Sequence, residues 1–428
     1  MGVRSVQACY DPAVSDAGPQ AGSGSLSARL RERLGAAIDE AQGWLPFERF
    51  MAIALYEPGL GYYARGAPIF GTRPEDGSDF VTAPELSPVF GRALARQVAQ
   101  VFDALGAAGA ARGAGEVFEF GAGSGALAEQ LLAALGERVR RYSIVDLSGT
   151  LRARQQQRLA PFGARVRWLD AWPERIEGVV LGNEVLDAMP VTLLAFDGER
   201  WAERGVVRAE RAGIRAECGV VRAARAGVGA APSGGAPRAV RAAEPVAFAW
   251  CDRATPLRPP LDAPYVAGTV TEIHPQAEAF VRSLAARLVR GAALFIDYGF
   301  PEAEYYLPQR HMGTLVCHRA HRVDTDPLAD VGAKDITAHV DFTGIALAAQ
   351  DAGLDVIGYT SQARFLLNCG FVSLLEGADA RTLGAAGKLV NEHEMGELFK
   401  VLGLARGLAL PAGEDWIGFA TGDRTHRL

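Results

Sequence analysis

A glycine-rich turn between a predicted strand and a predicted helix constrains the fold of this chain more than any other feature. The sequence EVFEFGAGSGALAEQLLAALG, residues 116–136, places an apolar strand before Gly121, Gly123 and Gly125. The leucines that follow recur with helical spacing, and Gly136 ends the predicted helix. Glycines allow a tight turn and close approach of a ligand, while the helix N-terminus offers unpaired N–H groups. The segment therefore predicts a strand–turn–helix unit with a ligand at its turn.

Short apolar runs alternate with helical patterns from residue 116 onward. Near-continuous apolar strands separated by helices are typical of a parallel sheet that is covered on both faces. We therefore predict an α/β fold with its main domain at residues 116–428. Seven strands are expected, with the sequences EVFEF, RYSIVD, RVRWL, GVVLGN, AALFIDYG, DVIGYT and WIGFAT.

The rest of the chain divides by composition and pattern. Residues 1–25 are rich in Gly, Ser, Ala and Pro without periodicity, and we expect a disordered tail. Residues 26–115 are expected to form an N-terminal helical and lid region. Its first helix is amphipathic and capped by Ser25 or Ser27, and PFERFMAIALY forms a second helix.

An insertion is predicted at about residues 191–275, where the alternation of strands and helices stops. It opens with a hairpin whose turn is Asp197-Gly198 and continues into an Ala/Arg/Gly-rich loop. We interpret the arginines of that loop as a solvated surface rather than as a binding patch.

Composition and charge exclude several classes of protein. The chain has 428 residues, of which 49% are hydrophobic, so it can bury a large core. It carries 44 Lys and Arg against 50 Asp and Glu without a long basic block, and we expect no nucleic-acid partner. The sequence has neither an apolar run of about 18 residues for membrane insertion nor an apolar secretion signal. We therefore expect a cytoplasmic location.

The glycine-rich turn fits two classes of ligand. Gly121, Gly123 and Ala126 satisfy the G-x-G-x-x-G/A pattern of dinucleotide enzymes. S-adenosylmethionine methyltransferases use acid-x-G-x-G-x-G, which is also satisfied. Glu119 favours the second class, because its carboxylate would crowd a pyrophosphate but would hold the methionine ammonium group, directly or through water. The residues predicted to bind S-adenosylmethionine here are Glu119, Gly121, Gly123 and Gly125; a glycine turn without a ligand is the alternative.

Acids also end the next two predicted strands. Asp146 can accept hydrogen bonds from both ribose hydroxyls, and Asp170 from the adenine amino group. We include the adjacent Leu147 and Ala171 in the predicted cofactor site. NAD and S-adenosylmethionine share both moieties, so these residues support a nucleoside ligand without separating the two. A helix cap or a plain turn acid is the alternative for each aspartate.

The segment TAPELSPVFG precedes the predicted sheet. Pro84 and Pro88 flank Glu85 and predict a stiff, non-helical entry to the following helix. We expect the segment to lie over the cofactor as a lid, with Pro84 and Glu85 at the cofactor. Capping of the helix is the alternative role for Glu85.

With these motifs in place, the chain resembles the MidA-like S-adenosylmethionine-dependent methyltransferases, whose mitochondrial members assist assembly of respiratory complex I. The resemblance covers most of residues 46–402, and two of its pieces are specific to that family, TAPELSPVFG and NEVLDAMP. It implies a class I, Rossmann-like fold with seven strands and S-adenosylmethionine as cofactor. It also implies protein arginine methylation, with a complex I subunit as a candidate substrate. The oligomeric state is left open, with a homodimer as one option.

The fourth predicted strand changes abruptly from apolar residues to Asn183, Glu184 and Asp187. The carboxyl ends of the strands face the ligand crevice in a doubly wound sheet. A guanidinium acceptor arrives charged and must lose a proton, and a carboxylate pair would hold it in a fixed geometry. We therefore expect Asn183 and Glu184 to line the acceptor side with Asp187 in support. Capping of the next helix is the alternative.

The segment DITAHVDFT supplies one more candidate for proton transfer. His339 is expected to accept a proton near neutral pH, and Asp335 to cap a helix. A structural histidine held by its neighbours is the alternative. The pair His318-x-x-His321 lacks a cysteine or paired acid to complete a ligand set, and no metal is predicted.

Three functions remain to be distinguished. The leading hypothesis is a methyltransferase that modifies a protein arginine. The second is an NAD(P)-dependent oxidoreductase, which the version of the glycine pattern ending at Ala126 allows. The third is a non-catalytic S-adenosylmethionine-binding assembly factor. Ligand binding separates the first two, and only turnover separates the first from the third.

Overall fold

The fold was analysed in a computed structural model, which describes residues 23–65, 81–106, 113–146, 149–209 and 246–428. Most of the predicted tail, most of the Ala/Arg/Gly-rich loop and Leu147 of the predicted cofactor site lie outside these residues.

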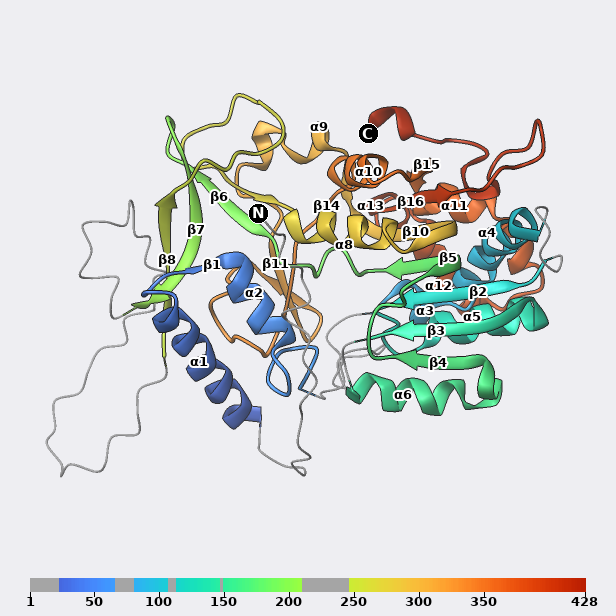
Figure 1. Cartoon of the computed structure of the whole chain (residues 1–428), viewed down its shortest axis with the longest axis horizontal. Coiled ribbons are helices and arrows are strands. Elements are labelled where there is room, and N and C mark those ends of the chain that lie inside the picture. Colours follow the sequence, from blue (N-terminus) through green and yellow to red (C-terminus); the bar gives the residue numbers. More distant parts are fainter. Residues whose placement is uncertain (1–22, 66–80, 107–112, 147–148, 210–245) are drawn as a thin grey trace, which may run out of the picture.

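An eight-stranded, mostly parallel sheet carries the α/β fold expected from the sequence (Figure 1). Its strands follow the order β15-β16-β10-β5-β2-β3-β4, and β14 pairs with β10. The strand β16 runs antiparallel to both of its neighbours. The strands are β2 (Gly115–Phe120), β3 (Val139–Val145), β4 (Val166–Leu169), β5 (Ile176–Asn183), β10 (Leu288–Phe300), β14 (Val340–Asp341), β15 (Asp355–Ser361) and β16 (Phe399–Arg406).

One predicted strand is wrong, and the sequence analysis does not predict the strand that replaces it. WIGFAT forms a 3-10 turn at Ile417–Phe419, and its Phe419 ring packs against Gly358 and Gly403 of the two outer strands. The sheet position belongs instead to β16, whose first seven residues are all buried. The apolar run at 416–421 therefore covers the sheet and does not extend it.

Helices cover both faces of this sheet, as a parallel sheet requires (Figure 1). Alternate residues of β2 reach the two cores: Val117 lies in the core with α4 and α5, and Phe118 lies in the core with α8 and α10. The helices are α4 (Val89–Gly106), α5 (Ala126–Leu135), α6 (Gly149–Leu159), α8 (Pro275–Ala285), α9 (Glu302–Tyr305), α10 (Phe342–Asp351), α11 (Gln362–Asn368), α12 (Ala380–Val390) and α13 (Met395–Leu398).

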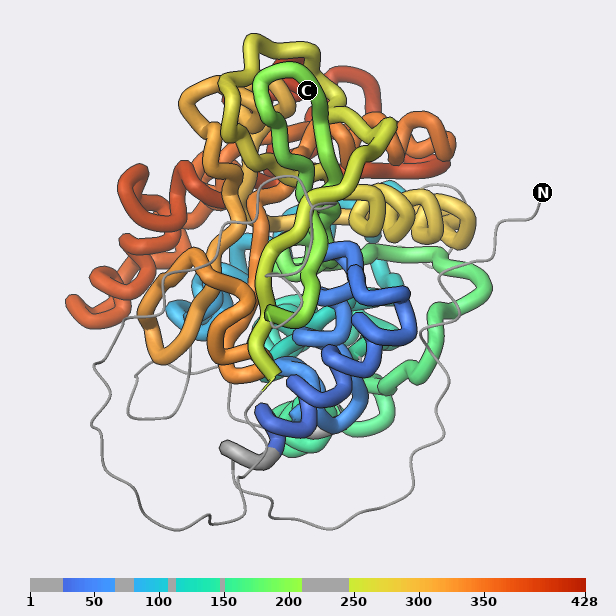
Figure 2. The backbone as a smooth tube through the Cα atoms, turned by 90° about the vertical axis from the view of Figure 1, so that its left-hand side faces the viewer, coloured from blue at the N-terminus to red at the C-terminus, as the bar shows by residue number. Residues whose placement is uncertain are grey.

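A second, antiparallel sheet of five strands packs against the N-terminal helices (Figure 2). The predicted hairpin at Asp197-Gly198 is confirmed, since Phe196 pairs with Trp201 across it. The first helix begins at Ser23, ahead of both predicted caps. The predicted domain limits remain predictions.

The N-terminal helices and the strands of the second sheet are α1 (Ser23–Glu40), α2 (Phe47–Tyr56), β1 (Leu45–Pro46), β6 (Thr192–Phe196), β7 (Trp201–Arg208), β8 (Phe248–Ala254) and β9 (Val270–Ile273).

Two local predictions near the site need correction. The segment before α4 contains a short helix, α3 (Ala83–Leu86), because Pro84 fits the first helical turn, where no N–H donor is needed. Asp335 lies in a short strand, β13 (Asp335–Thr337), which pairs with β11 (Val316–Arg319), itself paired with β12 (Arg322–Asp324). The N-cap of α10 is Asp341, whose carboxylate accepts hydrogen bonds from the first N–H groups of that helix.

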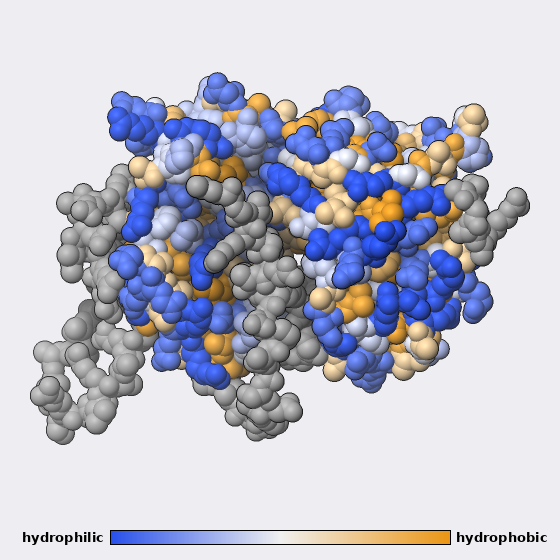
Figure 3. Space-filling model, viewed as in Figure 1, coloured by the Kyte–Doolittle hydropathy of each residue, from blue (hydrophilic) through white to orange (hydrophobic). Residues whose placement is uncertain are grey.

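None of the helices that the structure describes is long and apolar enough to cross a membrane. On the face shown in Figure 3, hydrophobic residues lie in small groups among hydrophilic ones. The large apolar side chains are concentrated instead in the cores on the two faces of the main sheet and beneath the antiparallel sheet.

A test of the sheet packing uses Gly178 of β5. Its φ is +147°, and a Cβ atom there would lie 2.2 Å from the carbonyl oxygen of Glu116 on the neighbouring strand. We expect Gly178→Ala to lower the free energy of unfolding by about 2 kcal/mol, measured by urea denaturation. Gly384→Ala is the control, because Gly384 lies in α12 with nothing near its Cβ position and should gain about 0.5 kcal/mol or more. Equal stability of Gly178→Ala and the wild type would contradict the packing argument.

Candidate functional site

The glycine-rich turn has the conformation that its sequence predicts. Gly121, Gly123 and Gly125 have φ values of +63°, +53° and +81°, which residues with a Cβ atom rarely adopt. A Cβ atom at Gly121 would also lie 2.9 Å from Val185, which belongs to the segment after β5. The turn therefore requires glycine, and it lies against the segment that carries the predicted acceptor residues.

Glu119 lies beneath this turn, inside the protein core. Its side chain is 2% exposed and accepts a hydrogen bond of 2.8 Å from the Tyr142 hydroxyl. Burial, together with the charge of Asp146, raises the pKa of Glu119 to about 8. Burial therefore favours the uncharged carboxyl in the protein without a ligand, and the predicted contact of Glu119 with an ammonium group stays a prediction.

Asp146 is held beside the glycine turn by Gln155, a residue of α6 that the sequence analysis missed. The buried Gln155 amide donates to the Gly123 carbonyl at 2.9 Å and to the Asp146 carboxylate at 2.8 Å. Its oxygen accepts from the Trp168 indole at 2.9 Å. Since every polar atom of this side chain is used, Gln155 fixes the predicted ribose-binding acid relative to the turn.

Asp170 and Ala171 lie at the exposed end of β4. The carboxylate of Asp170 is 80% exposed and forms an ion pair with Arg152 at 2.5 Å. An exposed ion pair of this kind constrains the side chain weakly. The predicted adenine contact of Asp170 stays a prediction.

The short helix α3 is attached to the glycine turn. Gln130 of α5 donates to the Pro84 carbonyl at 2.7 Å, and Glu85 accepts from the Ser124 hydroxyl and from Arg158 of α6, the latter at 2.8 Å. The Glu85 carboxylate therefore lies on the turn itself.

Glu184 follows β5 in a left-handed backbone conformation, with φ of +54°. Its N–H donates to the Ile296 carbonyl at 2.9 Å, and its carboxylate accepts from the Asn183 amide at 2.9 Å and from the Ala83 N–H. Burial, with the nearby charge of Asp187, raises the pKa of Glu184 to about 8. Within the described part of the chain, the buried Asn183 Oδ1 accepts no hydrogen bond.

Asp297 of β10 holds this segment in place and was not predicted as a site residue. Its Oδ2 accepts hydrogen bonds from the N–H groups of Val185, Leu186 and Asp187 at 3.1, 2.9 and 3.2 Å. Burial raises the pKa of Asp297 well above its ordinary value, and the charges of Asp187 and Glu184 add to the shift. The rule that strand-end acids face the crevice would have identified it, because Asp297 follows the apolar run AALFI.

Asp187 lies beside Tyr298 in a buried position. Burial raises the pKa of Asp187 to about 6, while a hydrogen bond from the Tyr298 hydroxyl opposes the shift. The other carboxylate oxygen, Oδ1, has no hydrogen-bond partner among the described residues. Glu184, Asp187 and Asp297, together with the Asn183 amide, thus lie close together toward the carboxyl ends of β5 and β10, and we call these four residues the acid cluster.

His339 contacts Tyr298 beside this cluster, and its surroundings favour the structural histidine over proton transfer near neutral pH. The imidazole lies 5.0 Å from the Tyr298 ring and stacks on Phe300 at 5.2 Å. Burial, helped by the charge of Arg310, lowers the pKa of His339 to about 4. The ring is therefore neutral at neutral pH, and it is a weak base.

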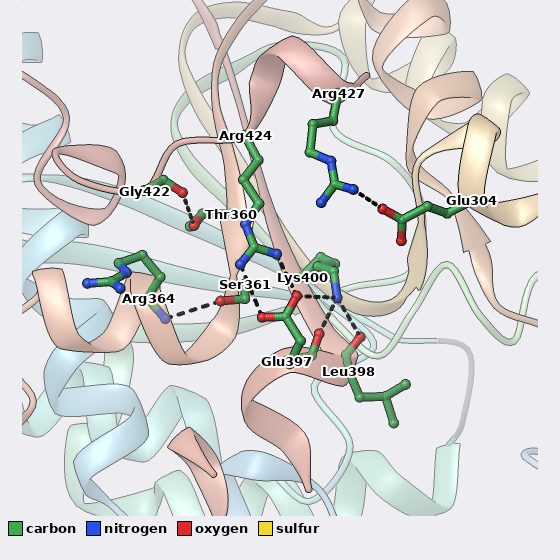
Figure 4. Close-up of polar contacts among 10 residues, drawn as sticks. All are labelled: Glu304, Thr360, Ser361, Arg364, Glu397, Leu398, Lys400, Gly422, Arg424 and Arg427. Carbon is green, nitrogen blue, oxygen red and sulfur yellow. Dashed lines mark hydrogen bonds and ion pairs between the residues drawn. The ribbon is translucent and has the colours of Figure 1, made fainter. Parts of the chain in front are cut away.

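A basic residue of β16 lies opposite Asp297 in the sheet, and Figure 4 shows the partners of its side chain. Lys400 pairs with Asp297 in strand register, yet its ammonium group bonds to Glu397 and to the Leu398 carbonyl. The Arg424 guanidinium donates two hydrogen bonds to the same Glu397 carboxylate. The ammonium group of Lys400 is therefore engaged outside the acid cluster. Among the described residues, no group of His, Cys, Asp and Glu side chains is arranged to hold a metal ion.

The role of Asp297 can be tested by unfolding. Asp297→Ala leaves three N–H groups at a largely buried position without an acceptor, and we expect a loss of about 3 kcal/mol in the free energy of unfolding in urea. Asp297→Asn keeps one acceptor oxygen and should lose less. The exposed Asp355 of β15 is the matched control, and its alanine variant should change stability by about 0.5 kcal/mol at most. An Asp297→Ala protein as stable as this control would contradict the anchoring role.

Comparison with known proteins identifies the family. Residues 93–360 match the family model described as "Putative S-adenosyl-L-methionine-dependent methyltransferase". A Burkholderia thailandensis crystal structure with bound S-adenosyl-homocysteine is 46% identical, covers 96% of this chain and 100% of its own, and superposes with a TM-score of 0.81. A second structure from that organism is 44% identical, covers 96% of this chain and 100% of its own, and superposes with a TM-score of 0.78.

Curated relatives are more distant but similar in length. "Protein arginine methyltransferase NDUFAF7, mitochondrial" from Danio rerio is 26% identical, covering 90% of this chain and 89% of its own. Its homolog from Drosophila melanogaster is 25% identical, covering 91% and 86%. The expected family, enzyme class and cofactor are therefore confirmed, and a dinucleotide oxidoreductase is not favoured. The chain belongs to the MidA-like family of S-adenosylmethionine-dependent methyltransferases.

Proposed function

We propose that this enzyme transfers a methyl group from S-adenosylmethionine to an arginine side chain of a protein. The observation that carries the proposal is the acid cluster beside the glycine turn, in which the buried oxygens Asn183 Oδ1 and Asp187 Oδ1 have no hydrogen-bond partner among the described residues. A guanidinium supplies five N–H donors and a positive charge, and it matches such a set of acceptors. The names of the relatives from Danio rerio and Drosophila melanogaster support the same acceptor.

The cofactor side is proposed to consist of the glycine turn and the residues attached to it. The left-handed glycines keep side chains away from the ligand, the N-terminus of α5 lies next to the turn, and Asp146 is fixed beside it by Gln155. These features fit the methionine and ribose parts of S-adenosylmethionine. When bound, the cofactor supplies an electrophilic methyl group on a sulfonium.

The acceptor side is proposed to orient the guanidinium and to receive its proton. The carboxylates of Glu184 and Asp187 can accept N–H bonds from two guanidinium nitrogens and thereby leave the third directed at the cofactor. As the nitrogen–carbon bond forms and the sulfur–carbon bond breaks, the guanidinium becomes a stronger acid, and Glu184 takes the proton. The positive charges of both substrates favour the ionised carboxylates against the effect of burial.

The partner and compartment are finer points of the proposal. The family resemblance suggests a respiratory complex I subunit as the substrate, and the relatives' names place those proteins in mitochondria. For this chain we retain the cytoplasm as the predicted compartment. A methyltransferase fold that binds a partner without turnover would show cofactor binding but no transfer, so activity decides between the two roles.

The test is transfer of labelled methyl groups. We expect the enzyme, incubated with labelled S-adenosylmethionine and a lysate of cells lacking it, to label a protein on arginine, identified by mass spectrometry. Glu184→Gln should reduce the labelling rate by about a hundredfold or more and retain S-adenosyl-homocysteine binding. Glu177→Gln is the control, because Glu177 is exposed on the same strand and should label normally. Wild-type labelling rates in Glu184→Gln would refute the assignment of Glu184.

The pH dependence gives a second test. Glu184 and Asp187 have pKa values raised to about 8 and about 6, so both are increasingly protonated as the pH falls through this window. Since the ionised forms pair with the guanidinium, kcat/KM should rise between about pH 6 and 8 and then level off. The apparent values belong to the interacting pair. Loss of the higher-pH step from the kcat/KM profile of Glu184→Gln would support the proposal. A flat kcat/KM profile of the wild type over this pH range would refute it.

A further inference from the structure

Two opposite charges meet at the glycine turn, and the proposed acceptor chemistry uses neither. The Arg158 guanidinium lies 2.8 Å from a carboxylate oxygen of Glu85 and 2.6 Å from the Ser124 hydroxyl. Ser124 also donates to Glu85. The three side chains come from α3, from the turn and from α6, so they join elements that are distant in the sequence.

The position of α3 relates this charge pair to the acid cluster. At one end of α3, the Ala83 N–H group bonds to the Glu184 carboxylate. Glu85, in the same short helix, bonds to Ser124 of the glycine turn. The same short helix therefore contacts the proposed acceptor side and the proposed cofactor side. A methyl donor that binds between these two sides would therefore lie next to α3.

The charge state of Glu85 distinguishes it from Glu119. Burial acts to raise the pKa of Glu85, but the bonds from Arg158 and Ser124 outweigh it and lower the pKa below its ordinary value. Burial raises the pKa of Glu119 to about 8. At neutral pH the carboxylate that is both ionised and on the turn belongs to Glu85.

The pair is held rigidly enough to act as a preformed site. Gln130 fixes α3 by donating to the Pro84 carbonyl at 2.7 Å, and it accepts from the Gly91 N–H at 2.9 Å. Arg158 is also 3.3 Å from Glu129 of α5, and its side chain remains 31% exposed. Its guanidinium thus has a fixed position and is still open to a ligand.

We propose that Glu85 and Arg158 form the subsite for the α-amino-acid end of the cofactor, in which Glu85 binds the ammonium group and Arg158 binds the carboxylate. The inference rests on the proposed function and assigns the ammonium contact to Glu85 instead of Glu119. A zwitterion has the same two charges at short separation as this ion pair, so each charge of the ligand meets its opposite.

Two ligands that differ only at this end provide the test. S-adenosyl-homocysteine carries the amino-acid group, whereas 5′-methylthioadenosine has the same adenosine and thioether without it. By calorimetry, Arg158→Met and Glu85→Gln should each weaken S-adenosyl-homocysteine binding by about tenfold or more and leave 5′-methylthioadenosine binding unchanged. Arg158→Lys keeps the positive charge and should recover part of the loss.

Arg154→Met is the matched control, because Arg154 is exposed one turn earlier on α6 and acts on Glu85 only through its charge. It should bind both ligands nearly as the wild type does. Unchanged S-adenosyl-homocysteine binding in Arg158→Met, or an equal loss for both ligands, would overturn the subsite. If the proposed arginine methylation is wrong but the subsite is right, no arginine would be methylated, yet Arg158→Met would still weaken S-adenosyl-homocysteine binding selectively.

Discussion

The site depends on one buried carboxylate, that of Asp297, which accepts hydrogen bonds from three consecutive backbone N–H groups. Those amides follow Glu184, whose left-handed backbone would be unfavourable in an unsupported chain. A carboxylate from the neighbouring strand compensates for this conformation. As a result, the turn after β5 keeps Glu184 next to the Ala83 N–H of α3, and Val185 packs against Gly121 of the glycine turn.

The buried acids also explain why the site suits cationic substrates. Several carboxyl groups lie close together with raised pKa values, and the nearby Lys400 is bonded to Glu397 and the Leu398 carbonyl. Desolvation and mutual repulsion disfavour their ionised forms in the protein alone. A sulfonium and a guanidinium would relieve both effects, so negative charge would develop where positive charge binds.

The sequence predicts the parts of the site that follow from short-range rules. The glycine turn, Asp146 and the end of β5 are recognisable because glycine spacing and strand-end acids have a direct physical meaning. Asp297 was not predicted, although the rule for strand-end acids applies to it. Gln155 could not be predicted, because no sequence pattern marks it. The 3-10 turn at WIGFAT and the pKa of His339 depend on packing between distant segments, which hydrophobic pattern alone does not report.

The antiparallel β16 has a consequence for synthesis of the chain on the ribosome. It is made after both β10 and β15, yet it occupies the position between them. Until residue 406 has emerged, one edge of β10 has no hydrogen-bonding partner there, and β15 cannot join the sheet. Nascent or truncated chains thus expose an apolar strand edge next to the active centre, which is the kind of surface that chaperones protect from aggregation.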